Sequence, residues 1–172
     1  MNWERVSMKK RHAIALAITL SAAMVSGTPA QQAPPSSPQA EAVVLGMDDL
    51  MTMLVQPRHV RLYYAGKAQN WELAAAEARN LRNSLTHIAA GIPTYLGNDV
   101  NQAVTGFLTP SLSAVDTAIA MADAAAFTKA YGQVTDGCNA CHTYMERPFL
   151  VIKAPGGDAD TAHPDQDYRP VP

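Results

Sequence analysis

Basic runs and cysteines are scarce in this chain of 172 residues: it has two cysteines, and no lysine-rich or arginine-rich run lies beyond residue 11. The low cysteine count excludes a disulfide-stapled miniprotein. The lack of a basic run removes the charge that a nucleic-acid interface needs. Hydrophobic residues make up 48% of the chain, which excludes a disordered tail. We therefore predict one modest soluble domain that does not bind nucleic acid.

Long apolar runs are also missing, since none reaches the roughly 20 residues that a helix needs to cross a membrane. The apolar run Ala13–Val25 follows four basic residues and precedes the small residues 28–30, an order typical of a secretory signal peptide over residues 1–30. An uncleaved N-terminal anchor is the alternative. The first 30 residues hold four of the 13 Lys and Arg and one of the 15 Asp and Glu, so residues 31–172 carry a net charge of −5. We expect an acidic periplasmic protein that is not integral to the membrane after cleavage.

Motifs for hydrolysis or group transfer are absent as well. The sequence has no Gly-rich phosphate loop, no G-x-S-x-G and no His-Glu-x-x-His. We therefore predict that the protein is not an enzyme.

The two cysteines that are present form one motif with a histidine. Cys138 and Cys141 are separated by two residues and are followed at once by His142. Cys-x-x-Cys-His is the attachment signature of c-type haem, in which two thiols bind the haem covalently and the histidine ligates the iron. The sequence thus predicts one covalent haem c, with Cys138, Cys141 and His142 as cofactor-binding residues and His142 as a ligand of the iron.

Three other interpretations of the cysteine pair are weaker. A thioredoxin-like redox pair needs a βαβ context, and no strand pattern precedes Cys138. A structural zinc site needs four ligands, and only scattered histidines remain to complete it. A plain disulfide across so short a loop would add little stability.

Apolar periodicity predicts an all-α domain, an antiparallel four-helix bundle over residues 46–155, after a flexible lead-in at 31–45 and before an irregular tail at 156–172. The first helix spans 48–66, with a kink at Pro57 and Gly66 as its C-terminal stop. The second begins at the N-cap Asn70 and ends near residue 91, and the third is capped by Asn98 and bent at Pro110. The fourth places both cysteines on the apolar stripe that runs from residue 127 to 145.

These features together resemble a known family. A signal peptide, four helices and Cys138–His142 on the last helix look like the monohaem four-helix-bundle c-type cytochromes of the cytochrome c-prime class. The stretches RHVRLYYAGKAQNWELAAAEARNLR and CNACHTYMERPFLVIKAP are similar to bacterial exported c-type cytochromes. The resemblance covers about residues 46–155, and it implies electron transfer or the binding of small gases. One departure is the length of chain after His142, where the run Phe149–Ile152 is expected to pack over a haem edge or a helix end.

The ligand opposite His142 separates those two functions. His59 lies on the apolar face of the first helix and is the favoured second ligand of the iron; its alternative is a hydrogen-bonded core histidine. Met51 and Met53 compete with it, because the low-spin relatives use a thioether on this helix, and an open sixth site is the third option.

Two functional hypotheses follow. The first is an exported electron carrier that exchanges one electron with redox partner proteins, and its acidic surface favours a partner with a basic docking patch. The second is a five-coordinate haem protein that binds nitric oxide or carbon monoxide. Homodimers are common in the family that the chain resembles, although no exposed apolar stripe in the sequence marks an interface.

Overall fold

The structure is a computed structural model that describes residues 44–157 and 166–170. Over these residues the chain is mostly helical with one short hairpin, so the prediction of an all-α protein is confirmed. The predicted signal peptide and residues 31–43 of the lead-in lie outside the described residues. No described helix is both long enough and apolar enough to cross a membrane.

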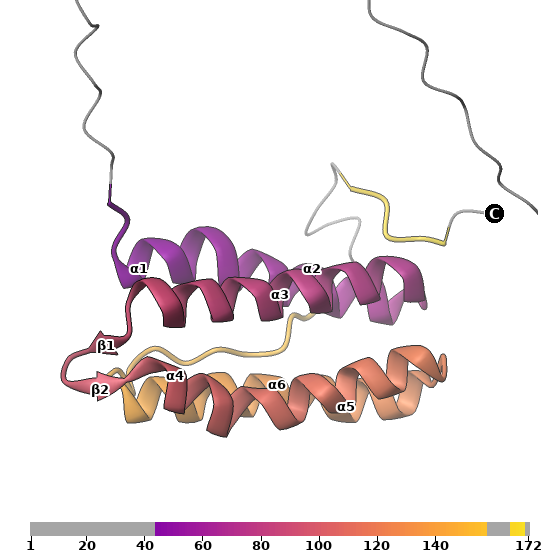
Figure 1. The fold of residues 1–172 in the computed structure, drawn as a ribbon. Coiled ribbons are helices and arrows are strands. Elements are labelled where there is room, and N and C mark those ends of the chain that lie inside the picture. Colours follow the sequence, from indigo (N-terminus) through magenta and orange to yellow (C-terminus); the bar gives the residue numbers. More distant parts are fainter. Residues whose placement is uncertain (1–43, 158–165, 171–172) are drawn as a thin grey trace, which may run out of the picture. The chain divides into compact units, whose positions relative to one another are not determined.

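The elements follow one another as shown in Figure 1. In chain order they are α1 (Met47–Leu50), the π-helical turn η1 (Met51–Val55), α2 (Gln56–Lys67), α3 (Trp71–Gly91), β1 (Thr94–Tyr95), β2 (Asn98–Asp99), α4 (Val100–Ala103), the π-helical turn η2 (Val104–Leu108), α5 (Thr109–Ala120) and α6 (Ala124–Tyr144).

The kink expected at Pro57 is a π turn, and the helix is not interrupted there. Proline has no N–H, and its ring clashes with the carbonyl four residues earlier in a regular α-helix. Just before the proline, the N–H of Gln56 bonds the carbonyl of Met51, five residues back, which is the wider spacing of a π turn. The bend expected at Pro110 is resolved in the same way, since the N–H of Thr109 bonds the carbonyl of Val104.

The predicted helix stop at Gly66 is wrong. α2 continues to Lys67, and the left-handed conformation that ends it falls on Gln69, with φ of 54°. Gly66 serves packing instead, because a Cβ at this position would lie 2.0 Å from the ring of Phe127 on α6. The absence of a side chain therefore lets α2 approach α6 closely.

The predicted cap Asn70 is confirmed, and the predicted cap Asn98 is wrong. The side chain of Asn70 accepts the N–H of Leu73 at the start of α3. Asn98 instead pairs with Tyr95 in the β1–β2 hairpin, whose two turn residues both have positive φ. The helix after the hairpin is capped by the next residue, Asp99, which accepts the N–H of Gln102 at 2.8 Å.

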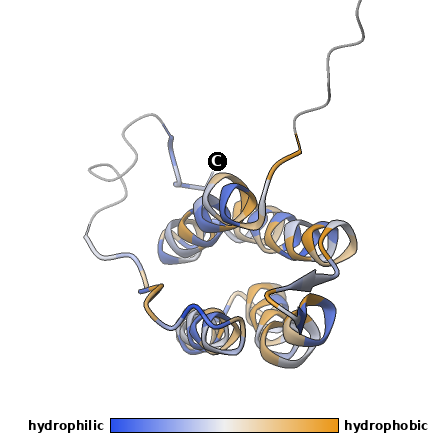
Figure 2. Cartoon of the chain, turned by 90° about the vertical axis from the view of Figure 1, so that its left-hand side faces the viewer, coloured by the Kyte–Doolittle hydropathy of each residue, from blue (hydrophilic) through white to orange (hydrophobic). Residues whose placement is uncertain are grey.

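The long helices contact one another in two pairs. α2 packs along α3 and α5 along α6, and contacts of α3 with α5 and of α2 with α6 join the pairs. Figure 2 shows that each helix carries both hydrophobic and hydrophilic residues. Ala65, Ala74 and Ala78 are fully buried, so small side chains fill much of the helix contacts.

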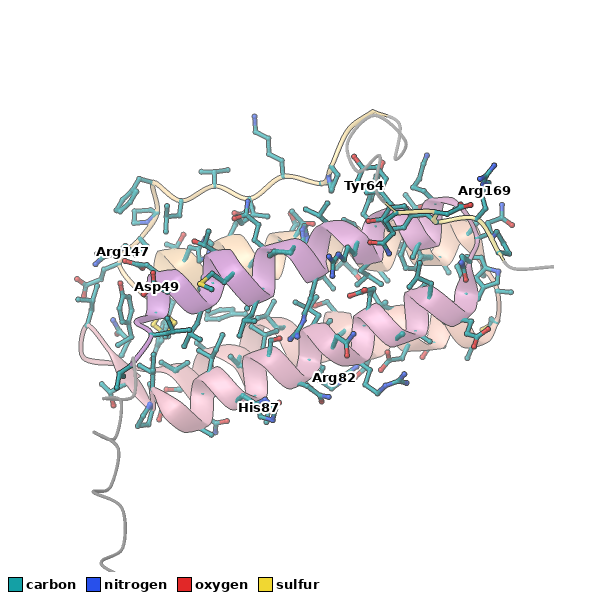
Figure 3. All side chains as sticks on the ribbon, turned by 90° about the horizontal axis from the view of Figure 1, so that it is seen from above. Asp49, Tyr64, Arg82, His87, Arg147 and Arg169 are labelled. Atoms are coloured by element: carbon teal, nitrogen blue, oxygen red, sulfur yellow. The ribbon has the colours of Figure 1, made fainter. Side chains whose placement is uncertain are left out.

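Two segments without regular secondary structure follow α6. Residues 147–156, which we call the strap, run from the end of α6 back along that helix, and the hydroxyl of Tyr64 donates to the carbonyl of Gly156 at 3.3 Å. In residues 166–170 the buried Tyr168 packs on Tyr64, with ring centroids 5.6 Å apart. Figure 3 shows Tyr64 and Arg169 at the end of the helices opposite to Asp49 and Arg147.

Candidate functional site

One cavity brings the motif residues together with the first helical segment. The cavity has a volume of about 170 Å³, whereas one buried water needs only about 10–15 Å³. Cys138, Cys141 and His142 all line this cavity. Much of the remaining wall is apolar and includes Val55, Leu85, Val100, Val104, Leu108 and Met145. The cavity can therefore take an apolar group far larger than a water molecule.

The two cysteines are free thiols on one face of α6. The helix is fixed at its start by Asp123, whose carboxylate accepts two backbone N–H groups at 3.0 and 2.9 Å. Burial, and secondarily the neighbouring Cys141, raises the pKa of Cys138 to about 12, and burial also raises the pKa of Cys141. Redox-active dithiols have a lowered thiol pKa, so these cysteines lack that property of a thioredoxin-like pair.

His142 has one ring nitrogen committed to the strap. Its Nδ1–H donates to the carbonyl oxygen of Leu150 at 2.8 Å. A metal-bound histidine commonly donates its second ring N–H to a carbonyl, which fixes the tautomer and the ring orientation. This hydrogen bond leaves Nε2 as the nitrogen with a lone pair, so the half-buried His142 is prepared as a ligand.

His59 lies on α2 and is only 2% exposed, and it lines the same cavity. Its Nε2 lies 3.0 Å from the hydroxyl of Thr135, and its Nδ1 lies 3.0 Å from the hydroxyl of Tyr131. Burial lowers the pKa of His59 to about 4, so the ring is neutral at pH 7. Burial also holds the pKa of Tyr131 well above its usual range, so that hydroxyl stays protonated.

Two arrangements of protons satisfy this buried group completely. In the first, Nε2–H donates to Thr135, whose hydroxyl donates to the carbonyl of Tyr131, while the Tyr131 hydroxyl donates to Nδ1. In the second, Nδ1–H donates to the Tyr131 hydroxyl, which donates to the carbonyl of His59, and the Thr135 hydroxyl donates to Nε2. Both are hydrogen-bonded core arrangements, and only the second leaves Nε2 without a proton.

The two methionine candidates lie in different surroundings. Met51 lines the cavity, whereas Met53 is 60% exposed and is not among the lining residues. The structure thus brings Met51, His59 and the motif residues together and leaves Met53 outside. His87 is exposed on α3 and is not among the lining residues either.

Sequence reasoning missed a polar cluster on the cavity wall. Arg147 donates to the hydroxyl of Tyr95 at 3.2 Å, and that hydroxyl donates to the Asp48 carboxylate at 3.4 Å. All three residues line the cavity. The guanidinium also lies over the rings of Tyr95 and Phe149, 5.5 and 5.9 Å from their centroids. No local pattern indicates this cluster, because its members come from α1, the hairpin and the strap.

The run 149–152 only partly packs as the sequence predicts. Leu150 and Ile152 line the cavity, while Phe149 and Val151 are 71% and 64% exposed. An extended chain sends alternate side chains to opposite sides, which explains the division.

The chain matches no protein-family model, no curated protein and no solved structure. Within the described residues, no three His, Cys, Asp or Glu side chains lie close enough together to hold a metal ion by themselves. A functional assignment therefore depends on the cavity and on the residues that line it.

Proposed function

We propose that the chain is an exported monohaem c-type cytochrome of the cytochrome c-prime type that carries single electrons, built as an antiparallel four-helix bundle. The supporting observation is that Cys138, Cys141 and His142 line one largely apolar cavity, with Nδ1 of His142 bonded to a backbone carbonyl. The haem, when bound, supplies an iron that gains and loses one electron.

The residues of the cavity suit such a group chemically. Cys138 and Cys141 would hold it covalently, and Nε2 of His142 would ligate the iron. The apolar wall would cover its ring, as an apolar protein interior does for any large hydrophobic group. The second ligand would be His59 or Met51, since both line the cavity.

A redox partner would meet a chain of net acidic charge at a part of the surface that exposes apolar side chains. Residues 31–172 carry a net charge of −5, which favours a partner with a basic docking patch. Phe149 and Val151 are strongly exposed on the strap, next to the cavity-lining Leu150. Aromatic residues are enriched at protein interfaces, so this part of the strap is where we place the contact.

A second candidate function is the binding of nitric oxide or carbon monoxide at an open sixth site. The observation that favours it is the complete hydrogen bonding of His59, because ligation by Nε2 would replace its contact with Thr135. Met51 would then be the remaining side-chain ligand from η1. If neither side chain bound the iron, a small neutral gas could do so from the apolar side of the cavity.

The first test is to produce the full chain in cells that attach c-type haem and to record its visible spectrum in the ferric, ferrous and carbon-monoxide-treated states. Low-spin bands that carbon monoxide does not change indicate two protein ligands and electron transfer. A high-spin spectrum that shifts with carbon monoxide supports the gas-binding function. A chain without covalent haem refutes both.

Variants assign the ligands. Replacing Cys138 and Cys141 together by Ala should abolish covalent attachment, and His142→Gln should change the spin state of the iron. His87→Gln is the matched control, because His87 is exposed on α3 and does not line the cavity. If His142→Gln left the spectrum unchanged, His142 would not be the ligand.

A further inference from the structure

The strap is attached to α6 by the side chain of Asn139, the residue that follows the first cysteine of the motif. The Asn139 carboxamide oxygen accepts the N–H of Ile152 at 2.7 Å, and its Nδ2 donates to the carbonyl of the same residue at 2.9 Å. One amide side chain therefore pairs with both backbone groups of one strap residue. Because its oxygen and its nitrogen each have a partner of the right kind, the orientation of the amide is fixed.

This attachment lies one helical turn from His142. Residues three apart on a helix are neighbours on its surface, so Asn139 and His142 present adjacent groups to the strap. Ile152 binds the first and Leu150 binds the second, at two positions of one extended segment. The position of the Leu150 carbonyl therefore depends on where Asn139 holds Ile152.

The side chains of strap residues 149–151 are largely outside the core. Phe149 and Val151 are largely exposed, and Leu150 is 43% exposed. Within the described residues, the strap backbone also forms a turn directly after α6, in which the N–H of Arg147 donates to the carbonyl of His142 and the N–H of Leu150 to the carbonyl of Arg147. Near the far end of the strap, Tyr64 donates to the carbonyl of Gly156. Beyond that turn, the Asn139 pair is the described hydrogen bonding that ties the residues after Leu150 to α6 near His142.

We propose that Asn139 is a positioning residue for His142. It holds the strap so that the Leu150 carbonyl accepts the Nδ1 proton and the ring keeps the tautomer with a free Nε2. Its effect on an iron centre rests on the proposed function, but its effect on the strap and on the tautomer does not.

The test compares Asn139→Ala with Gln133→Ala, a matched control that removes an exposed amide from the same helix. In the full chain without haem, the amide of Ile152 should exchange with solvent about fivefold faster in Asn139→Ala, the change expected for one hydrogen bond of about 1 kcal/mol. Nitrogen NMR at alkaline pH, where histidines are neutral, should show His142 moving from the Nδ1–H tautomer to a mixture. Gln133→Ala should change neither.

Asn139→Asp provides a second variant if Asn139→Ala does not fold. It keeps an acceptor for the N–H of Ile152 and loses the donor to its carbonyl, so the His142 tautomer should change less than in Asn139→Ala. In haem-loaded protein, Asn139→Ala should raise the reduction potential, because a ligand that loses its second hydrogen bond becomes less basic. The proposal would be overturned if, in Asn139→Ala, the amide of Ile152 exchanged at the wild-type rate and the His142 tautomer did not change. It would also be overturned if Gln133→Ala changed the exchange rate and the tautomer as much as Asn139→Ala does.

The outcomes separate the two proposals. Failure to attach haem refutes the proposed function, and the exchange and tautomer measurements on the haem-free chain still decide the role of Asn139. Attachment of haem with no effect of Asn139→Ala on potential, exchange or tautomer leaves the cytochrome intact and removes Asn139 as a positioning residue.

Discussion

The stability of the haem-free chain should decrease in mild acid because of His59. Its pKa is about 4 in the folded protein, against an ordinary value of 6.5. Between these two pH values the unfolded chain binds a proton that the folded chain does not, so the free energy of unfolding rises with pH across this window. The contribution is fully present above pH 6.5 and is lost as the pH falls to 4.

The size of the effect follows from the shift. A lowering from 6.5 to about 4, at 1.36 kcal/mol for each pH unit, corresponds to about 3 kcal/mol. The side chain is only 2% exposed, so solvent screening does not reduce this figure much. Stabilities of domains are about 5–15 kcal/mol, and a loss of this size is therefore large.

The assay is urea unfolding followed by circular dichroism at a series of pH values from 7.5 to about 4. The His59→Leu variant should lose the pH dependence that His59 causes, whatever its stability at pH 7. His87→Gln is the control, because it removes an exposed histidine that does not line the cavity. If His59→Leu and the wild type showed the same slope between pH 6.5 and 4, the reasoning would be refuted; His59→Gln serves if the Leu variant does not fold.

Urea unfolding at pH 7 also tests four further substitutions. Gly132→Ala should raise the free energy of unfolding by about 0.5–1 kcal/mol, because a Cβ there meets no atom within 4 Å and Ala favours helix. Gly137→Ala, on the same helix, should lower it by about 1–3 kcal/mol, because its Cβ would lie 2.4 Å from the carbonyl oxygen of Phe107; equal effects at the two glycines would contradict the packing argument. Glu77→Met should raise the free energy of unfolding by about 1 kcal/mol, since one carboxylate oxygen of Glu77 is buried without a hydrogen-bond partner among the described residues. A loss of stability in this variant would show that the oxygen has a partner. Asp123→Ala should lower the free energy of unfolding by about 1 kcal/mol, because α6 loses its N-cap. An unchanged free energy of unfolding would mean that the cap is dispensable.

Local signals in the sequence predicted most of the helices. Asn70 caps α3 as expected because an N-cap depends on a side chain and the backbone three residues later. The apolar stripe of α6 was predicted for a similar reason, since Phe127, Val134 and Cys141 repeat at helical spacing and are buried.

Features that depend on contacts between distant segments were not predictable in the same way. Gly66 looked like a helix stop, but the ring of Phe127, far along the chain, determines its role. Arg147 reaches the cavity wall because the strap turns back after α6, which no periodicity indicates. The haem-attachment motif correctly indicated the residues of α6 that line the cavity. The polar cluster around Arg147, in contrast, could be found only from the structure.

The two π turns adjust the phase of the helices that line the cavity. Both occur in the same pattern, a threonine followed five residues later by a proline, at Thr52 to Pro57 and at Thr105 to Pro110. A regular α-helix advances about 100° per residue, so eight residues from Met51 to His59 would leave the two side chains about 80° apart. One surplus residue in a π turn reduces the effective step to seven, which is close to two whole turns, and places both on the same wall. Conversion of η1 to regular α-helix with every residue kept would therefore rotate Met51 away from the cavity by about 100°. Loss of a single residue such as the exposed Met53 would instead leave the two side chains seven regular steps apart, on the same wall.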